Sequence, residues 1–255
     1  MSEKGNSVSD IFVQKLSEKK WKILTREAIA DIWSLSGGSK SRFAYGLGKV
    51  KNQSLVSSLG WGLYSLGSEF TEWDSHYWQI VAMLLLRYSP SGGIIAHEKS
   101  MEYHLHNYEI PKCLVLYTRD TDKRVHIGEY DIHMRTLKTW EKSGTKNMYR
   151  ILFDASIEGR IDNIKLRFLS LEAGLLDVAS LRIHESGIDE DLILRFLSKY
   201  AKKLSREKLW ELVQYRYIRA VNRIRALAKS HNYSDLYTHC LDIIKKEGGG
   251  CYLSR

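Results

Sequence analysis

The sequence is poor in proline and cysteine, and each scarcity excludes a class of protein. Only two prolines occur among 255 residues, which favours a helix-rich chain because proline interrupts helices. The three cysteines, Cys113, Cys240 and Cys251, are odd in number, widely spaced and form no CxxC pair. The spacing therefore predicts neither a disulfide framework nor a structural zinc site, and a reducing cytoplasm is the expected compartment.

Long hydrophobic runs are missing as well. The longest one, Ile80 to Leu86, is far shorter than the roughly 20 apolar residues that a membrane-spanning helix needs. The first ten residues are polar and lack the apolar run of a signal peptide. We therefore expect no membrane partner. Hydrophobic residues still make up 44 % of the chain, which is enough for a sizeable core.

Recognisable catalytic motifs are also absent. The chain has no GxSxG pattern, and Gly46 and Gly48 lack the third glycine of a nucleotide-binding loop. His97 and Glu98 begin like the zinc-protease motif HExxH, but the residue at position 101 is Met. We predict that the protein is not an enzyme and that it holds no cofactor and no metal.

Two weaker signals for metal chemistry keep an alternative open. His104 and His106 could approach one metal ion from an extended backbone, although no third ligand is evident. A metal-dependent nuclease would need clustered carboxylates. Four candidates follow one another in the sequence: Asp120, Asp122, Glu129 and Asp131. Their spacing around an expected loop is more typical of a solvated turn.

Basic charge is concentrated in two parts of the chain. Residues 1–70 carry 10 basic and 6 acidic side chains, and residues 195–231 carry 11 and 2. The middle, residues 71–194, carries 15 and 19, so it is mildly acidic. This asymmetry fits a polyanion or an acidic protein as a partner at one or both basic parts. The competing interpretation is that these side chains only solvate helix faces.

The N-terminal pattern predicts a winged helix-turn-helix in residues 1–68. A short capped helix follows Ser9-Asp10, and a second one begins after Thr25 as N-cap. A break at residues 35–39 precedes a third helix, which Ser39 can cap. Residues 55–66 then read as two short strands around a glycine-rich turn. Helix, helix, turn, helix and β-hairpin, in this order, are the parts of a winged helix.

The third helix has the composition of a DNA-recognition helix. Between Ser39 and Lys51 it holds four basic residues and no acidic one. Residues at the start of such a helix reach base edges, while its flanks contact phosphates. The candidate DNA-binding residues are Ser39, Lys40, Ser41, Arg42, Tyr45, Lys49 and Lys51. Arg42 suits a bidentate contact to guanine, and Ser39 lies where the helix dipole attracts phosphate.

Two features qualify this prediction. Gly46 and Gly48 weaken the third helix, and a solvated basic helix is the competing interpretation. Trp61 lies where the tip of the wing is expected and completes the candidate set. It could touch the DNA backbone, but a packing role on the hairpin is favoured.

The remainder, residues 69–255, is predicted to be a mixed α/β domain that ends in helices, so the fold class is α+β. The expected helices cover residues 73–87, 98–106, 171–179, 189–200 and 205–230. The expected strands cover residues 113–118, 148–153 and 164–168, and residues 125–134 are expected to form a strand or a hairpin.

The expected helix over residues 205–230 offers a second basic surface. Arg216, Arg219, Arg223 and Arg225 lie largely off its apolar stripe. Such a surface could meet DNA phosphates or an acidic partner protein.

Three stretches together resemble the AbiEi family, the antitoxins of type IV abortive-infection toxin–antitoxin systems. The first is the N-terminal unit followed by a helix at residues 78–86. The second, residues 100–118, carries Ile110-Pro111 before an apolar strand, although Asn107 stands where glycine is common. The third is the helix start Ser170, Glu172 and Leu175-Leu176-Asp177.

The resemblance implies a specific function. Members of the family repress their own operon by binding inverted repeats near the promoter, and they counter a toxin of the nucleotidyltransferase type. By this resemblance the partners of the chain are double-stranded DNA and a cognate toxin, and residues 69–255 serve the antitoxin role. The alternatives are a regulator of a mobile element without a toxin, and the nuclease named above.

Overall fold

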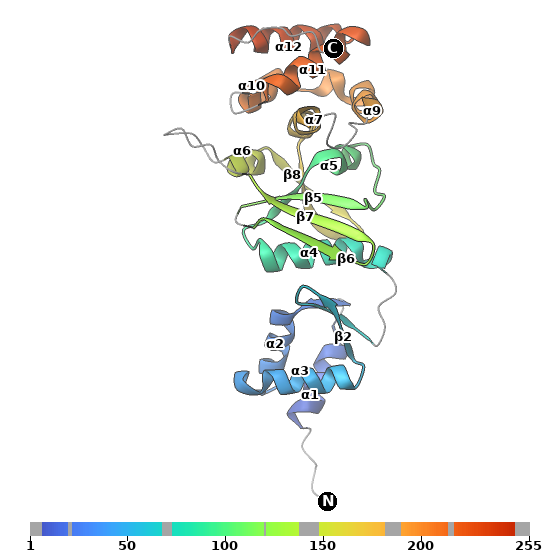
Figure 1. The fold of residues 1–255 in the computed structure, drawn as a ribbon, viewed down its shortest axis with the longest axis vertical. Coiled ribbons are helices and arrows are strands. Elements are labelled where there is room, and N and C mark those ends of the chain that lie inside the picture. Colours follow the sequence, from blue (N-terminus) through green and yellow to red (C-terminus); the bar gives the residue numbers. More distant parts are fainter. Residues whose placement is uncertain are drawn as a thin grey trace, which may run out of the picture. The chain divides into compact units, whose positions relative to one another are not determined.

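The computed structural model describes residues 7–19, 22–67, 73–119, 121–137, 148–181, 190–213 and 217–247. It shows a mixed α+β protein with N-terminal helices beside a small antiparallel sheet, a central mixed six-stranded sheet, and C-terminal helices (Figure 1). The chain divides into two compact units, residues 1–90 with 125–131, and residues 91–124 with 132–255. The boundary predicted after residue 68 falls within the first unit and stays a prediction. Among the described residues, no helix is long and apolar enough to cross a bilayer.

The first unit begins with three helices around a three-stranded sheet. Its elements are α1 (Val8–Ser17), β1 (Ile23–Thr25), α2 (Arg26–Leu35), the 3-10 helix η1 (Lys40–Arg42), α3 (Phe43–Asn52), β2 (Val56–Gly60) and β3 (Leu63–Leu66). The sheet order is β1-β3-β2, and both pairings are antiparallel. Helix α4 (Trp73–Tyr88) belongs to the same unit.

The helix starts follow their capping residues, with two differences from expectation. Thr25 caps α2 as predicted, since its hydroxyl accepts from the Ala28 N–H at 3.2 Å. Helix α1 is capped by Ser7, in a capping box with Asp10, and so begins earlier than Ser9. The third helix starts with the 3-10 turn η1, and the side chain of Ser39 makes no capping hydrogen bond.

The indole of Trp33 organises the core of the first unit. It meets Phe12 edge to face, with ring centroids 5.2 Å apart, and its Nε1–H donates to the Ser39 carbonyl at 2.9 Å. A Cβ on Gly46 would lie 2.6 Å from the indole ring, and one on Gly38 would lie closer still. Gly46, expected only to weaken the helix, is therefore what lets α3 lie against Trp33.

The elements after α4 lie in the second unit, except that residues 125–131, which form most of β6 and the start of β7, belong to the first. The strands are β4 (Gly93–Ile95), β5 (Cys113–Thr118), β6 (Lys123–Ile127), β7 (Tyr130–Thr136), β8 (Ser156–Ile161) and β9 (Ile164–Leu169). The helices are α5 (His97–His104), α6 (Met148–Asp154), α7 (Leu171–Ser180), α9 (Glu190–Tyr200), η2 (Ala201–Lys203), α10 (Arg206–Val213), α11 (Ile218–Ser230) and α12 (Ser234–Lys246). The six strands follow the order β6-β7-β5-β4-β9-β8, and β4 pairs in parallel with β9.

Two segments differ from the sequence-based expectation. Residues 148–153 form helix α6 and not a strand, because Met148, Tyr149 and Leu152 become buried together at helical spacing. The single helix expected over residues 205–230 is two helices, α10 and α11, with residues 214–216 outside the described part. The expected strand at residues 113–118 is confirmed, and residues 125–134 belong to the hairpin of β6 and β7.

Helix α7 lies at the centre of the second unit. Its two buried carboxylates accept hydrogen bonds from the N-terminal ends of other helices. Ser170 caps α7 itself, through a bond from the Ala173 N–H at 3.3 Å. Glu172, 4 % exposed, accepts from the Ser205 N–H at 2.9 Å, at the start of α10. Asp177, 2 % exposed, accepts from the His97 N–H at 2.9 Å, at the start of α5. A carboxylate placed there satisfies a backbone donor and complements the helix dipole.

Asp177 also anchors β5 to this centre. It accepts a hydrogen bond from the Tyr117 hydroxyl at 2.7 Å, and burial together with the Asp177 charge raises the pKa of Tyr117 well above its usual value. The Ser170, Glu172 and Asp177 pattern that resembles the AbiEi family thus has a structural role in this chain: it ties three elements to α7.

The Trp33 contact leads to a paired test. Gly46→Ala should destabilise the first unit by about 1–3 kcal/mol, because the new methyl group overpacks against the indole. Gly48→Ala is the matched control on the same helix, since a Cβ there meets nothing within 4 Å, and it should gain up to about 1 kcal/mol from helix propensity. Urea unfolding followed by circular dichroism measures both; equal midpoints for the two variants would contradict the packing role.

Candidate nucleic-acid interface

The predicted DNA-binding segment presents one side to solvent. Gly46, Leu47 and Val50 of α3 are buried. The residues that point away from this core include Lys40, Ser41 and Arg42 of η1, which are exposed, and Tyr45, whose side chain is 72 % exposed. The structure therefore brings the predicted reading residues together on one exposed face, beside the first turn of α3.

The two lysines at the end of α3 each lie near another side chain of the first unit. Lys51 is exposed, and its Nζ lies 5.0 Å from the ring centroid of Tyr64. Lys49 is half-buried and lies near Asp10 of α1. Hydrogen bonds from Ser7 lower the pKa of Asp10, and the Lys49 charge adds to this effect. A neighbouring carboxylate, which the sequence pattern did not indicate, thus offsets part of the Lys49 charge.

Trp61, predicted at the tip of the hairpin, is tied into its own unit. Its backbone is left-handed with φ +55°, and its side chain is 38 % exposed. The indole Nε1–H donates to the His126 carbonyl at 3.1 Å, and the Trp61 carbonyl accepts from the Tyr88 hydroxyl at 2.9 Å. These contacts give Trp61 a packing role, and its contact with DNA stays a prediction.

The next residue, Gly62, explains how the turn is held. Its carbonyl accepts from the Arg26 N–H at 2.9 Å, and its φ of +75° favours glycine. A Cβ there would lie 2.5 Å from the Arg87 guanidinium, which forms an ion pair with Glu27. The pairing helps to lower the pKa of Glu27, against the effect of its partial burial. The hairpin turn is therefore fastened to α2 and α4 within the first unit.

The four C-terminal arginines do not form one surface. Arg219 is exposed. Arg223 turns inward and donates to the carbonyls of Ala179, at 2.7 Å, and Leu181, at the end of α7. Arg225 is 6 % exposed, and Arg216 lies outside the described residues. The reason is that α11 packs against α7 on one side and α12 on the other, so that little of it faces solvent (Figure 1).

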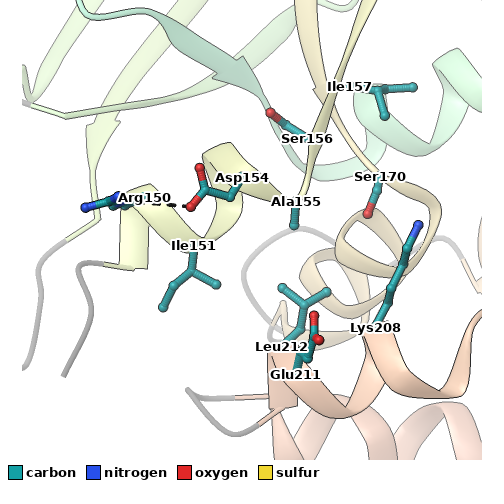
Figure 2. A pocket seen from close by; sticks show the side chains of 10 residues that line it. All are labelled: Arg150, Ile151, Asp154, Ala155, Ser156, Ile157, Ser170, Lys208, Glu211 and Leu212. Carbon is teal, nitrogen blue, oxygen red and sulfur yellow. Dashed lines mark ion pairs between the residues drawn. The ribbon is translucent and has the colours of Figure 1, made fainter.

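A cavity of about 480 Å³ lies in the second unit between α6, the start of β8 and α10, beside Ser170 (Figure 2). Its rim is charged, with Arg150 and Asp154 paired at 3.9 Å, and with Lys208 and Glu211 from α10. Ile151, Ala155 and Leu212 supply apolar lining. The mixed charge gives the cavity no preference for a ligand of one sign, and the sequence pattern gave no signal for it.

The histidines and carboxylates weighed for metal chemistry are dispersed. His104 Nε2 bonds the Leu169 carbonyl at 2.8 Å, and burial lowers its pKa; His106 Nδ1 instead lies 3.1 Å from the Tyr108 hydroxyl. Asp131 pairs with His126 at 3.0 Å. Asp120 lies outside the described residues. Within the described ranges, no three His, Cys, Asp or Glu side chains are placed to hold a metal ion.

The comparisons with known proteins bear on the fold. No family model matches the chain, and the search of curated proteins finds no match. Among solved structures, the chain is similar to the RV2827C protein from Mycobacterium tuberculosis, with a TM-score of 0.55 and 15 % sequence identity. The alignment covers 90 % of this chain and 78 % of that one. At this identity the likeness extends to the fold alone.

Two of the three arginines of α11, Arg223 and Arg219, offer a test of the inward placement of Arg223. Arg223→Ala should lower the free energy of unfolding by about 1–3 kcal/mol, because the carbonyls at the end of α7 lose a charged donor. Arg219→Ala, an exposed arginine on the same helix, should change it by less than about 0.5 kcal/mol. The melting temperatures of both variants are compared with that of the wild type. An unchanged melting temperature of Arg223→Ala would show that its hydrogen bonds to Ala179 and Leu181 do not stabilise the fold.

Proposed function

We propose that the protein is a DNA-binding transcriptional repressor whose first unit acts as a winged helix-turn-helix. The observation that carries the proposal is the exposed basic face of η1 and α3, with Lys40, Arg42 and Tyr45 at its centre. The order of α1, α2, α3 and the β2–β3 hairpin, with β1 completing a three-stranded sheet, supports it.

The expected mode of binding follows from the side chains. Arg42, at the junction of η1 and α3, suits a bidentate contact to the O6 and N7 of guanine in the major groove. Lys40 and Lys51 suit phosphate contacts, which fix the register of the helix on the duplex. The Tyr45 hydroxyl can bond a base or the backbone. Bound at a promoter, the protein represses by occluding it, without chemistry.

We further propose that the repressor is the antitoxin of a type IV abortive-infection system, countering a nucleotidyltransferase-type toxin. The support is the resemblance to the AbiEi family at Ile110-Pro111 and at Ser170 to Asp177. The latter stretch forms the structural centre of the second unit. A regulator without a toxin and a metal-dependent nuclease are the alternatives.

Duplex binding is tested with DNA from upstream of the protein's own gene. Lys40→Ala combined with Arg42→Ala should weaken specific binding by at least tenfold, since a lost guanine contact alone costs about 1–3 kcal/mol. Circular dichroism should stay unchanged, because both side chains are exposed. Lys19→Ala, an exposed lysine just after α1, is the control and should bind as wild type.

The same titration over a series of salt concentrations distinguishes contacts with bases from contacts with phosphates. Lys51→Ala should reduce the slope of log K against log salt by about 1, as expected for one phosphate contact, and should weaken all duplexes similarly. Gel-shift affinity of the Lys40→Ala, Arg42→Ala protein equal to that of the wild type would refute the proposed interface.

The antitoxin role is tested by growth. Co-expression with a neighbouring nucleotidyltransferase-like gene product should restore growth of cells that the toxin alone arrests. The Lys40→Ala, Arg42→Ala protein, expressed from a foreign promoter, should rescue equally well, because the antitoxin role is assigned to the second unit. Failure of both proteins to rescue would favour a regulator without a toxin.

A further inference from the structure

Exposed positive charge is concentrated on α9 and η2 in the second unit. Four exposed cations fall within nine residues: Arg195, Lys199, Lys202 and Lys203. No acidic residue occurs between positions 195 and 205. We call these four residues the α9–η2 surface. It differs from the basic surface expected on residues 216–225, where Arg223 and Arg225 turn inward.

An aromatic ring is fixed in the middle of this charge. Lys199 and Lys203 place their Nζ atoms 5.2 Å and 5.6 Å from the ring centroid of Tyr200. The Tyr200 hydroxyl donates to the His104 carbonyl at 2.5 Å, which locks the ring in place. The two ammonium groups therefore lie near a ring of fixed position, which reduces the conformational entropy that the lysines would lose on binding a partner.

A series of ring contacts leads from this surface to an exposed tyrosine. The rings of His104 and Tyr200 have centroids 6.4 Å apart, those of Tyr103 and His104 5.8 Å, and those of Tyr103 and Tyr108 5.9 Å. The Tyr108 side chain is 44 % exposed, and its hydroxyl lies 3.1 Å from His106 Nδ1. An exposed tyrosine is therefore part of the same side-chain network as the lysines.

We propose that the α9–η2 surface, together with Tyr108, binds single-stranded nucleic acid. Lysines and arginines follow the phosphates of a strand, and exposed aromatic rings stack on its unpaired bases. A duplex hides its bases in the stack, and an acidic protein would be held by the cations alone. The exposed ring of Tyr108 is the feature that favours a single strand over both.

The probe is a fluorescently labelled single strand of about twelve nucleotides, followed by anisotropy with the full chain. Lys199→Ala/Lys202→Ala/Lys203→Ala should weaken binding at least tenfold and reduce the salt slope by about 0.7 for each lost phosphate contact. Arg219→Ala/Lys229→Ala/Lys245→Ala removes three exposed cations from α11 and α12 and is the matched control, expected to bind as wild type.

Variants at Tyr108 distinguish a single strand from the other possible partners. Tyr108→Ala should weaken binding of the single strand by about fivefold or more, since a stacked base contributes about 1–3 kcal/mol, whereas Tyr108→Phe keeps the ring and should bind normally. A wild-type protein that does not bind the strand overturns the proposal. So does equal affinity of the wild type and the triple lysine variant.

Two further results would overturn it in favour of another partner. If a duplex of the same length competes equally well and Tyr108→Ala has no effect, the surface recognises double-stranded phosphates. If only an acidic polypeptide such as polyglutamate competes, it is a protein-docking surface. The Lys40→Ala, Arg42→Ala protein should keep full single-strand binding, so that failure of the duplex-binding proposal and failure of this one remain distinguishable.

Discussion

The contact between Trp33 and two glycines is the constraint on which the first unit depends. The indole occupies the space that side chains at positions 38 and 46 would take, and its N–H holds the Ser39 carbonyl. It therefore sets where α2 ends, where η1 begins and how closely α3 approaches the core. The backbone that carries Lys40, Arg42 and Tyr45 is thereby held against the core at Ser39 and Gly46.

The packing of the second unit depends on charged side chains that bond to the ends of its helices. Glu172 and Asp177 satisfy the starts of α10 and α5, while Arg223 satisfies the end of α7. Burial of a charged group is costly unless hydrogen bonds compensate, and here backbone donors and acceptors at helix ends provide them. The count of arginines in residues 195–231 consequently overstates the positive surface, because Arg223 and Arg225 stabilise the fold.

Much of the fold was predictable from local patterns. Thr25 as a helix cap, the β2–β3 hairpin and the strand from Cys113 to Thr118 depend on short-range chemistry, and they appear where expected. Residues 148–153 were assigned the wrong structure because a short apolar run fits both a strand and a buried helix. Strands β1 and β4 went unnoticed because each has only three residues and is defined by its partners.

The candidate site was predictable in composition but not in detail. The run of basic residues marks η1 and α3, whereas the 3-10 start and the Asp10 neighbour of Lys49 arise from packing. A packing role is the favoured prediction for Trp61, but the hairpin sequence does not reveal its partner, because His126 is distant in sequence. The inward turn of Arg223 likewise depends on α7, which no periodicity within α11 reveals.

The division of α3 into two sides has a consequence for how such a protein can diverge. Arg42, Ala44 and Tyr45 are exposed, so their replacement alters what the surface meets without repacking the core. Positions 33, 38 and 46 share one volume, so a change at any of them demands a compensating change at another. Substitutions on the exposed side can therefore accumulate one at a time, while the tryptophan and its glycines change together or stay as they are.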